Sequence, residues 1–231
     1  MNWKAVQQRL ADRGYDPGPI DGIPGPRTEA AIVRFKVANG LRARPYVGPV
    51  TLAKLGVNAA PFAPDLPWMN EAAKHMGLHE RTHFSRLFAW LRSDGAAVGD
   101  PRQLPWCGDF VETCIKLTMP DEPFTGRLKQ NPYLARNWLE FGTVERGYGA
   151  VAVFWRGSPR GLSGHVGFAV GHDPKRGRIR VRGGNQSNSV SDTWLDGSRL
   201  LGYRKPKTWA QKLPPLPVLD SKGVPVSRNE A

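Results

Sequence analysis

The chain has 231 residues, of which 40% are hydrophobic, 10% aromatic and 23% charged. This composition is typical of a globular protein and excludes wholesale disorder, and the length fits one large domain or two smaller ones. The 26 glycines and 21 prolines predict many turns and short elements. No apolar run approaches the roughly 20 residues that a membrane-spanning helix needs, so we expect no stable membrane insertion.

The charge is strongly basic, with 33 Lys and Arg against 20 Asp and Glu, a net charge of +13 and a pI near 10.2. Such a field attracts polyanions, including nucleic acid, anionic membranes and anionic cell walls. The basic residues are spread along the chain, however, without a dense Lys/Arg tract, a zinc-finger pattern or a basic zipper. Charge alone therefore does not choose among these partners, although we expect none of them to be nucleic acid.

Proline content divides the chain. Three prolines occur in the ten residues that begin at Asn58, a composition that disfavours both helix and strand. A second proline-rich stretch, without a clear period, follows position 205. We accordingly expect a first domain at 1–58, a Pro/Ala linker at 59–66, a second domain at 67–206 and an extended Pro-rich C-terminal tail at 207–231.

The first domain has the pattern of three short helices. Val6 and Leu10 share the face of one helix, which Gly14 can end. The Gly25-Pro26 pair predicts the start of a second helix, because proline is favoured in the first turn. The expected apolar face of that helix is formed by Ala30, Ile32, Val33, Phe35 and Val37. Gly48-Pro49 repeats the helix-start pattern, so a small three-helix bundle is predicted.

Residues 3–57 resemble the type 1 peptidoglycan-binding domain. The residues that carry the resemblance are Gly14, Tyr15, Asp21, Gly22, Gly25, Thr28, Phe35, Gly40, Leu41, Val47, Gly48 and Thr51. The sequence departs from the family pattern at Lys36, where Gln is usual, and at Arg44-Pro45-Tyr46, where Asp-Gly usually precedes the second Val-Gly. The resemblance implies peptidoglycan as the partner, with Tyr15 and Asp21 as candidate binding residues.

Cys107 lies where a helix of the second domain is predicted to begin, because apolar residues follow at helical spacing from Phe110 to Leu117. Free N–H groups at a helix N-terminus favour a thiolate, so we expect a lowered thiol pKa and a nucleophilic Cys107. The alternative is a small buried hydrophobe, as most free cysteines are, and we expect that role for Cys114. Seven positions on a helix separate the two thiols by about 10 Å, which excludes a disulfide.

His165 is the best-placed base for such a nucleophile. It lies in a Gly-flanked alternating strand, and a hairpin turn at 173–177 joins that strand to a second one ending at Asn185. Asn185 could orient the imidazole, which completes a Cys-His-Asn set. Gln186 competes for this role, because adjacent residues of an extended strand point to opposite faces.

The segments PWCGDFV, SGHVGFAVG and VRGGNQSNSV resemble the NlpC-type, CHAP-related cysteine peptidoglycan hydrolases, over about residues 66–206. The resemblance implies an α+β, papain-like domain with N-terminal helices packed on an antiparallel sheet. It also implies Cys107 as nucleophile, His165 as base, Asn185 as orienting residue, and Trp106 and Gln186 at the substrate. No metal or other cofactor is implied.

His79-Glu80-x-x-His83 matches the HExxH pattern, in which two histidines of one helix bind zinc and the Glu is a general base. Gly77 just before it predicts a helix end, and no third ligand is evident nearby. A zinc metallopeptidase is therefore an alternative to the thiol mechanism, and we expect no metal site.

Together these patterns predict a peptidoglycan endopeptidase or N-acetylmuramoyl-L-alanine amidase that acts as a monomer and needs no cofactor. Because the N-terminus lacks a secretory signal, we expect synthesis in the bacterial cytoplasm. Access to the wall would then follow holin-dependent release or association with a virion or gene-transfer particle, as for a phage endolysin. The alternative is a non-catalytic wall-binding or virion structural protein.

Overall fold

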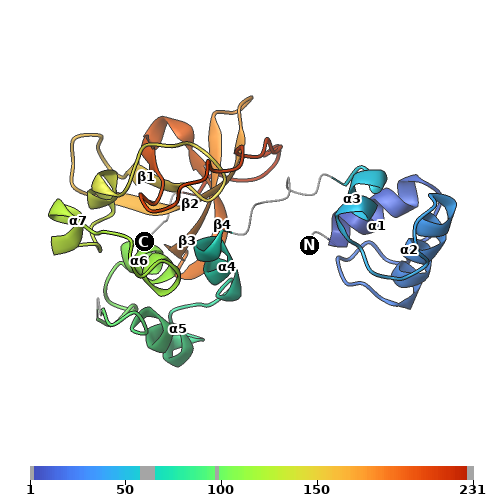
Figure 1. Ribbon diagram of the computed structural model, residues 1–231, viewed down its shortest axis with the longest axis horizontal. Helices are drawn as coiled ribbons and strands as arrows, with labels where there is room; N and C mark the ends of the chain where they lie inside the picture. Colours follow the sequence, from blue (N-terminus) through green and yellow to red (C-terminus); the bar gives the residue numbers. More distant parts are fainter. Residues whose placement is uncertain (1–2, 58–65, 97–98, 228–231) are drawn as a thin grey trace. The chain divides into compact units, whose positions relative to one another are not determined.

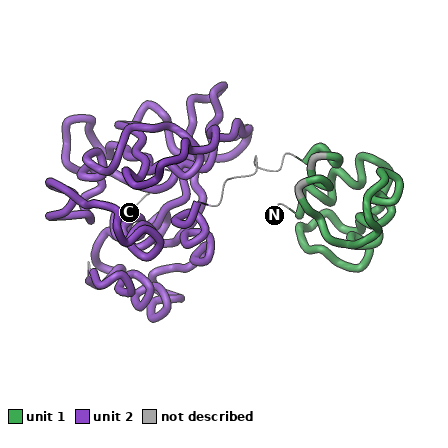
Figure 2. The backbone as a smooth tube through the Cα atoms, viewed as in Figure 1, with its two compact units in different colours: residues 1–62 green, residues 63–231 purple. Residues whose placement is uncertain are grey.

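The computed structural model of the protein describes residues 3–57, 66–96 and 99–227. The chain forms two compact units, Met1–Phe62 and Ala63–Ala231 (Figure 2). Of the expected linker, residues 59–65 lie outside the described residues, whereas Leu66 is buried in the core of the second unit. Each unit has a hydrophobic core of its own.

The first unit is the expected helical bundle. Its helices are α1 (Trp3–Asp12), α2 (Pro26–Ala38) and α3 (Pro49–Leu55). Its core includes Val6, Leu10, Ile32, Phe35 and Leu55, each at most 1% exposed.

The expected apolar face of α2 was partly wrong. Ala30 is exposed and Val37 is 60% exposed, whereas Lys36 is buried. The Lys36 ammonium donates hydrogen bonds to the carbonyl oxygens of Arg44 and Tyr46, at 3.0 and 2.9 Å. Its aliphatic stem therefore lies in the interior, and the hydrogen bonds of its ammonium group fix the loop that follows α2. Lys36, which departs from the family pattern, therefore has a structural role in fixing this loop.

The second unit is a mixed α+β domain (Figure 1). Its helical elements are α4 (Pro67–Lys74), α5 (Phe84–Leu91), α6 (Cys107–Thr118), α7 (Gly126–Gln130), η1 (Ala135–Glu140) and η2 (Gly197–Arg199). Its strands are β1 (Val151–Trp155), β2 (Gly164–Asp173), β3 (Arg178–Gln186), β4 (Ser189–Asp196) and β5 (Leu200–Arg204). The strands form one antiparallel sheet in the order β4-β3-β2-β1-β5.

The two faces of the sheet pack against different partners. Val166 and Phe168 of β2 join the main core, to which α4, α5, α6 and η1 contribute. Ala169 of β2 and Phe154 of β1 belong to a smaller cluster with Ile179 and Val181 of β3. This alternation is expected because successive side chains of a strand point to opposite faces. The helical layer therefore covers one face, and α6 packs against β2 and β3.

The segment after position 205 packs on the second unit instead of extending away from it. His172 of β2 donates its backbone N–H to the Pro217 carbonyl, and Leu219 donates its own to the His172 carbonyl, both at 2.8 Å. The buried Ser221 hydroxyl donates to Asp173 at 2.6 Å. The pairing of β1 with β2 ends at Phe168, so this segment lies beside the part of β2 that β1 does not reach.

The start of α6 lies where β2 and β3 diverge. The described β2–β3 ladder runs from Asp173–Arg178 to Phe168–Arg182, and β3 then continues beside β4 with a register shift between Gly183 and Gln186. A Cβ on Gly184 would lie 2.5 Å from the Trp106 ring and 2.6 Å from the Phe110 Cβ. The absence of a side chain at Gly184 is therefore what lets α6 approach β3.

We predict that Gly184→Ala destabilises the second unit by about 1–3 kcal/mol, the usual cost of overpacking a close-packed core. Urea unfolding followed by tryptophan fluorescence measures the change. Gly161→Ala is the matched control, because its Cβ would meet only ordinary contacts at 3.5 Å or more. Equal stability of the two variants would contradict the steric role of Gly184.

Candidate functional site

Cys107 is the first residue of α6, as the sequence predicts, and it is 4% exposed. The backbone N–H groups of Val166 in β2 and Gly108 in the helix lie near enough to its sulfur to favour the thiolate. The thiol therefore bridges the start of α6 and the backbone of β2, one residue beyond His165.

The expected lowering of the thiol pKa was wrong. Burial raises the pKa of Cys107, and this effect outweighs the opposing N–H donors and the positive charge of Arg156. A helix N-terminus favours a thiolate that water can reach, whereas burial penalises the charged form more strongly. Cys114 is fully buried, and burial raises its pKa further. Both cysteines are free thiols.

His165 is buried in β2 and pairs across the sheet with Phe154 of β1. Directly paired residues project to the same face, so its side chain leaves β2 on the face opposite to Val166 and α6. Its Nε2 atom lies 3.1 Å from the position that a Cβ on Gly183 would take. The imidazole and the Cys107 sulfur thus both lie near the end of the β2–β3 ladder, but on opposite faces of the sheet.

Gln186 lies beside the same point. Its Cδ and Nε2 atoms are each 3.3 Å from the hypothetical Gly183 Cβ. Its Nε2 donates to the carbonyl oxygens of Ser191, Gly183 and Val181, at 2.5, 3.1 and 3.4 Å. These three acceptors orient the amide, and its buried Oε1 has no hydrogen-bond partner among the described residues. The His165 ring and the Gln186 amide thus both border Gly183.

The expectation that Asn185 and Gln186 point to opposite faces required an extended backbone at this point, and that expectation was wrong. Asn185 has φ +57°, in the left-handed region, inside the register shift of β3. Strict alternation between opposite faces does not hold there, because that rule requires extended geometry. Asn185 is 4% exposed and lines a small pocket with Glu80 and Asn188.

Trp106 is fully buried, so its indole offers no surface to a polymeric ligand. Its Nε1 donates to Glu80 Oε2 at 3.1 Å. Glu80 belongs to the HExxH pattern, and the Gly77-x-x-Glu80 spacing also resembles that of the cysteine hydrolases, which need no zinc. A contact between residues 26 positions apart leaves no local signal, because it depends on how α6 packs against the preceding loop.

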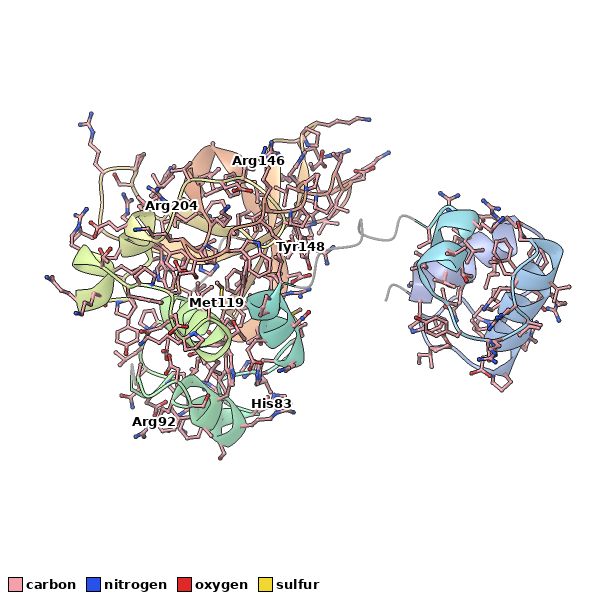
Figure 3. The ribbon with its side chains drawn as sticks, in the orientation of Figure 1. His83, Arg92, Met119, Arg146, Tyr148 and Arg204 are labelled. Atoms are coloured by element: carbon pink, nitrogen blue, oxygen red, sulfur yellow. The ribbon has the colours of Figure 1, made fainter. Side chains whose placement is uncertain are left out.

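The HExxH segment is a turn, not a helix. Residues 79–83 form an isolated bridge and turns, and α5 begins at Phe84. The Nδ1 of His79 accepts the Arg81 N–H, and the Nδ1 of His83 accepts the His79 N–H. His83 lies beside α5 (Figure 3). Among the described residues, no group of three or more His, Cys, Asp or Glu side chains is arranged to hold a metal ion.

In the first unit, the residues of the family pattern surround a buried glutamine. Gln7 donates to Asp21, Ile23 and Thr28, and accepts the N–H of Gly22 at 2.8 Å. The candidate binding residue Asp21 is exposed, and the N–H of Ile23 lowers its pKa. Tyr15 is half-buried and packs edge-on against Phe35.

Asp109 is a buried acid two residues beyond the thiol. It is fully buried, and neither carboxylate oxygen has a hydrogen-bond partner among the described residues. Burial raises its pKa to about 8, and the charges of Glu112 and Asp94 add to this effect. The group is therefore mostly neutral at pH 7, so its position in the first helical turn adds little negative charge near Cys107.

This raised pKa predicts a specific dependence of stability on pH. Below about pH 4, Asp109 is protonated in both folded and unfolded chains and imposes no ionisation penalty. Between pH 4 and 8 only the unfolded chain ionises, so stability falls by as much as about 1.4 kcal/mol per pH unit. We predict that Asp109→Asn gains stability relative to the wild type across this range, as measured by urea unfolding. Parallel pH profiles would contradict this prediction, and the exposed Asp121→Asn is the control.

Comparison with known proteins identifies the first unit. Residues 2–55, which include its three helices, match the family model described as "Putative peptidoglycan binding domain". No curated protein and no solved structure matches the chain. This match supports a peptidoglycan-binding domain in the first unit and suggests association with the cell wall.

Proposed function

We propose that the chain is a peptidoglycan hydrolase in which the wall-binding domain holds a thiol-dependent catalytic domain at its substrate. The observation that carries the proposal is the contact of the Cys107 sulfur with the backbone N–H of Val166, the residue after His165. The thiol therefore lies at the residue that follows His165, although the His165 side chain leaves β2 on the opposite face. Tethering to an insoluble polymer raises the local concentration of such a catalyst.

The second unit is proposed to have a papain-like fold. Two features support this: the thiol begins a helix, and the histidine lies on the antiparallel sheet against which that helix packs. The resemblance of the segments around Cys107, His165 and Gln186 to NlpC-type hydrolases is independent support.

The proposed reaction is hydrolysis of an amide bond in the wall peptide or at its junction with the sugar. His165 accepts the thiol proton while the sulfur attacks the carbonyl carbon, and the imidazolium then protonates the departing amine. Water, deprotonated by His165, attacks the resulting thioester and restores the thiol. The N–H groups at the start of α6, that of Cys107 among them, stabilise the oxyanion.

The raised pKa of Cys107 explains why a base is needed. A neutral buried thiol is a weak nucleophile, so proton transfer to His165 has to accompany the attack. Arg156 favours the thiolate electrostatically. The imidazole lies on the sheet face opposite to α6, so the proposed proton transfer requires a rearrangement that brings it to the sulfur.

We propose Gln186, in preference to Asn185, as the residue that orients His165. The Gln186 carboxamide lies beside the imidazole, its Nε2 is held by backbone carbonyls, and its unused Oε1 is available to accept an imidazole N–H. Such a residue fixes the tautomer without taking part in bond breaking.

Amidase and endopeptidase activities both fit this chemistry. The proposed biological setting is that of an endolysin, which reaches the wall from the bacterial cytoplasm by holin-dependent release or as part of a virion or gene-transfer particle.

A second candidate is a non-catalytic wall-binding or virion structural protein. The observation that favours it is the burial of Cys107, which is 4% exposed. The two functions differ in whether purified sacculi release soluble fragments.

We predict that Cys107→Ala abolishes the release of muropeptides from purified sacculi, because no other described group can replace the thiol. Cys114→Ala is the matched control and should retain activity, with a packing loss of about 1 kcal/mol. EDTA should not change the wild-type rate. Full activity of Cys107→Ala would overturn the thiol mechanism, and an inactive wild type would favour the second candidate.

We also predict that deleting residues 1–57 weakens sedimentation with sacculi more than it slows cleavage of a small soluble stem peptide. The two units have separate cores, and the proposed catalytic residues all lie in the second. Cosedimentation assays and soluble-substrate kinetics separate the two effects. Undiminished sedimentation of the truncated protein would contradict the role of the first unit in wall binding.

A further inference from the structure

A small pocket is lined in part by the loop that precedes Cys107 in the sequence. It has a volume of about 210 Å³ and is lined by Glu80, Pro101, Arg102, Gln103, Leu104, Pro105, Asn185 and Asn188. The loop at 101–105 leads directly into Trp106 and Cys107, and Asn185 precedes Gln186. A ligand in this pocket would therefore lie beside the residues that we assign to catalysis.

Glu80 is the fixed group of this pocket. Its side chain is nearly buried, at 5% exposure, and its Oε2 accepts the indole N–H of Trp106 at 3.1 Å. Its backbone N–H donates to the Asn188 carbonyl at 2.9 Å. Two residues before Glu80, the carbonyl of Leu78 accepts a hydrogen bond from the backbone N–H of Val190. The indole thus fixes the carboxylate, and the backbone bonds fix the segment that carries it.

The carboxylate of Glu80 has no cationic partner among the residues that line the pocket. Arg102 is its other charged lining residue, and its guanidinium donates to both carboxylate oxygens of Asp100, at 2.6–3.1 Å. It also stacks 3.8 Å above the Phe84 ring. The indole that contacts Glu80 is neutral, so none of the lining residues of this pocket pairs with its carboxylate as a cation. A buried carboxylate is costly unless a cation pairs with it.

We propose that this pocket binds a primary ammonium group of the wall peptide, with Glu80 as its counter-ion. Asn185 and Asn188 supply carboxamides that can accept or donate further hydrogen bonds to the peptide. This inference takes its substrate class, the wall peptide, from the proposed function. It adds that the enzyme recognises stem peptides with a free amine through the positive charge of that amine. An ammonium paired with a desolvated carboxylate gains a charge-assisted hydrogen bond.

The test measures binding without turnover, so that it does not depend on catalysis. Calorimetry with Cys107→Ala compares a synthetic wall peptide containing a diamino acid with the same peptide acetylated at every amine. We expect the free amine form to bind at least about tenfold more tightly, the effect of one hydrogen bond to a charged group. Singly acetylated peptides identify the amine that is recognised.

The decisive variant is Glu80→Gln in the same background, because Gln still accepts the Trp106 N–H but carries no charge. We expect the preference for the amine to fall to less than about twofold, with an unchanged melting temperature. Trp106→Phe keeps the charge and removes the indole donor, so the preference should persist if that variant folds. A preference that survives Glu80→Gln, or equal binding of both peptides to Cys107→Ala, would overturn the proposal.

These outcomes are distinct from failure of the proposed function. Equal binding of the two peptides, with hydrolysis of sacculi by the wild type, rejects the ammonium pocket and leaves the hydrolase intact. A charge-dependent preference in a protein that hydrolyses no wall peptide supports the pocket and rejects the hydrolase.

Discussion

The end of the β2–β3 ladder at Phe168 and Arg182 is the constraint on which the candidate site depends. Continuous pairing there would commit the Val166 N–H to the ladder and leave no space for the start of α6. Gly184 permits the approach of the Trp106 and Phe110 side chains, and Gly183 leaves room for the His165 ring and the Gln186 amide. The end of the ladder at Gly183 and Gly184 thus accommodates side chains from α6 and the residue before it, from β2 and from the end of β3.

This arrangement has an energetic cost that bears on function. Burial raises the pKa values of Cys107 and Asp109, so the neutral forms of both groups are favoured near α6. Unpartnered polar atoms in an interior destabilise the folded state, and such atoms occur on Asp109 and Gln186. Perturbed pKa values and unpartnered buried polar atoms, which lower the stability of the fold, are typical of functional sites.

Much of the architecture could be predicted from local signals. Gly-Pro pairs correctly indicated α2 and α3, and the hairpin between β2 and β3 followed from its turn residues. Two kinds of error have physical causes. The left-handed backbone of Asn185 broke the alternation rule, and the burial of Cys107 outweighed the effect of the helix N-terminus on its pKa. The contact between Glu80 and Trp106 depends on tertiary packing, which spacing in the sequence cannot reveal.

The central claim is that the Cys107 sulfur forms a covalent bond with the acyl group of the wall peptide. Intact-protein and peptide mass spectrometry after an acid quench, with a soluble muropeptide as substrate, tests it most directly. The account predicts a transient adduct on Cys107 with the mass of the acyl fragment, which disappears as product accumulates. Product formation without any adduct on Cys107, or an adduct on Cys114, would contradict it.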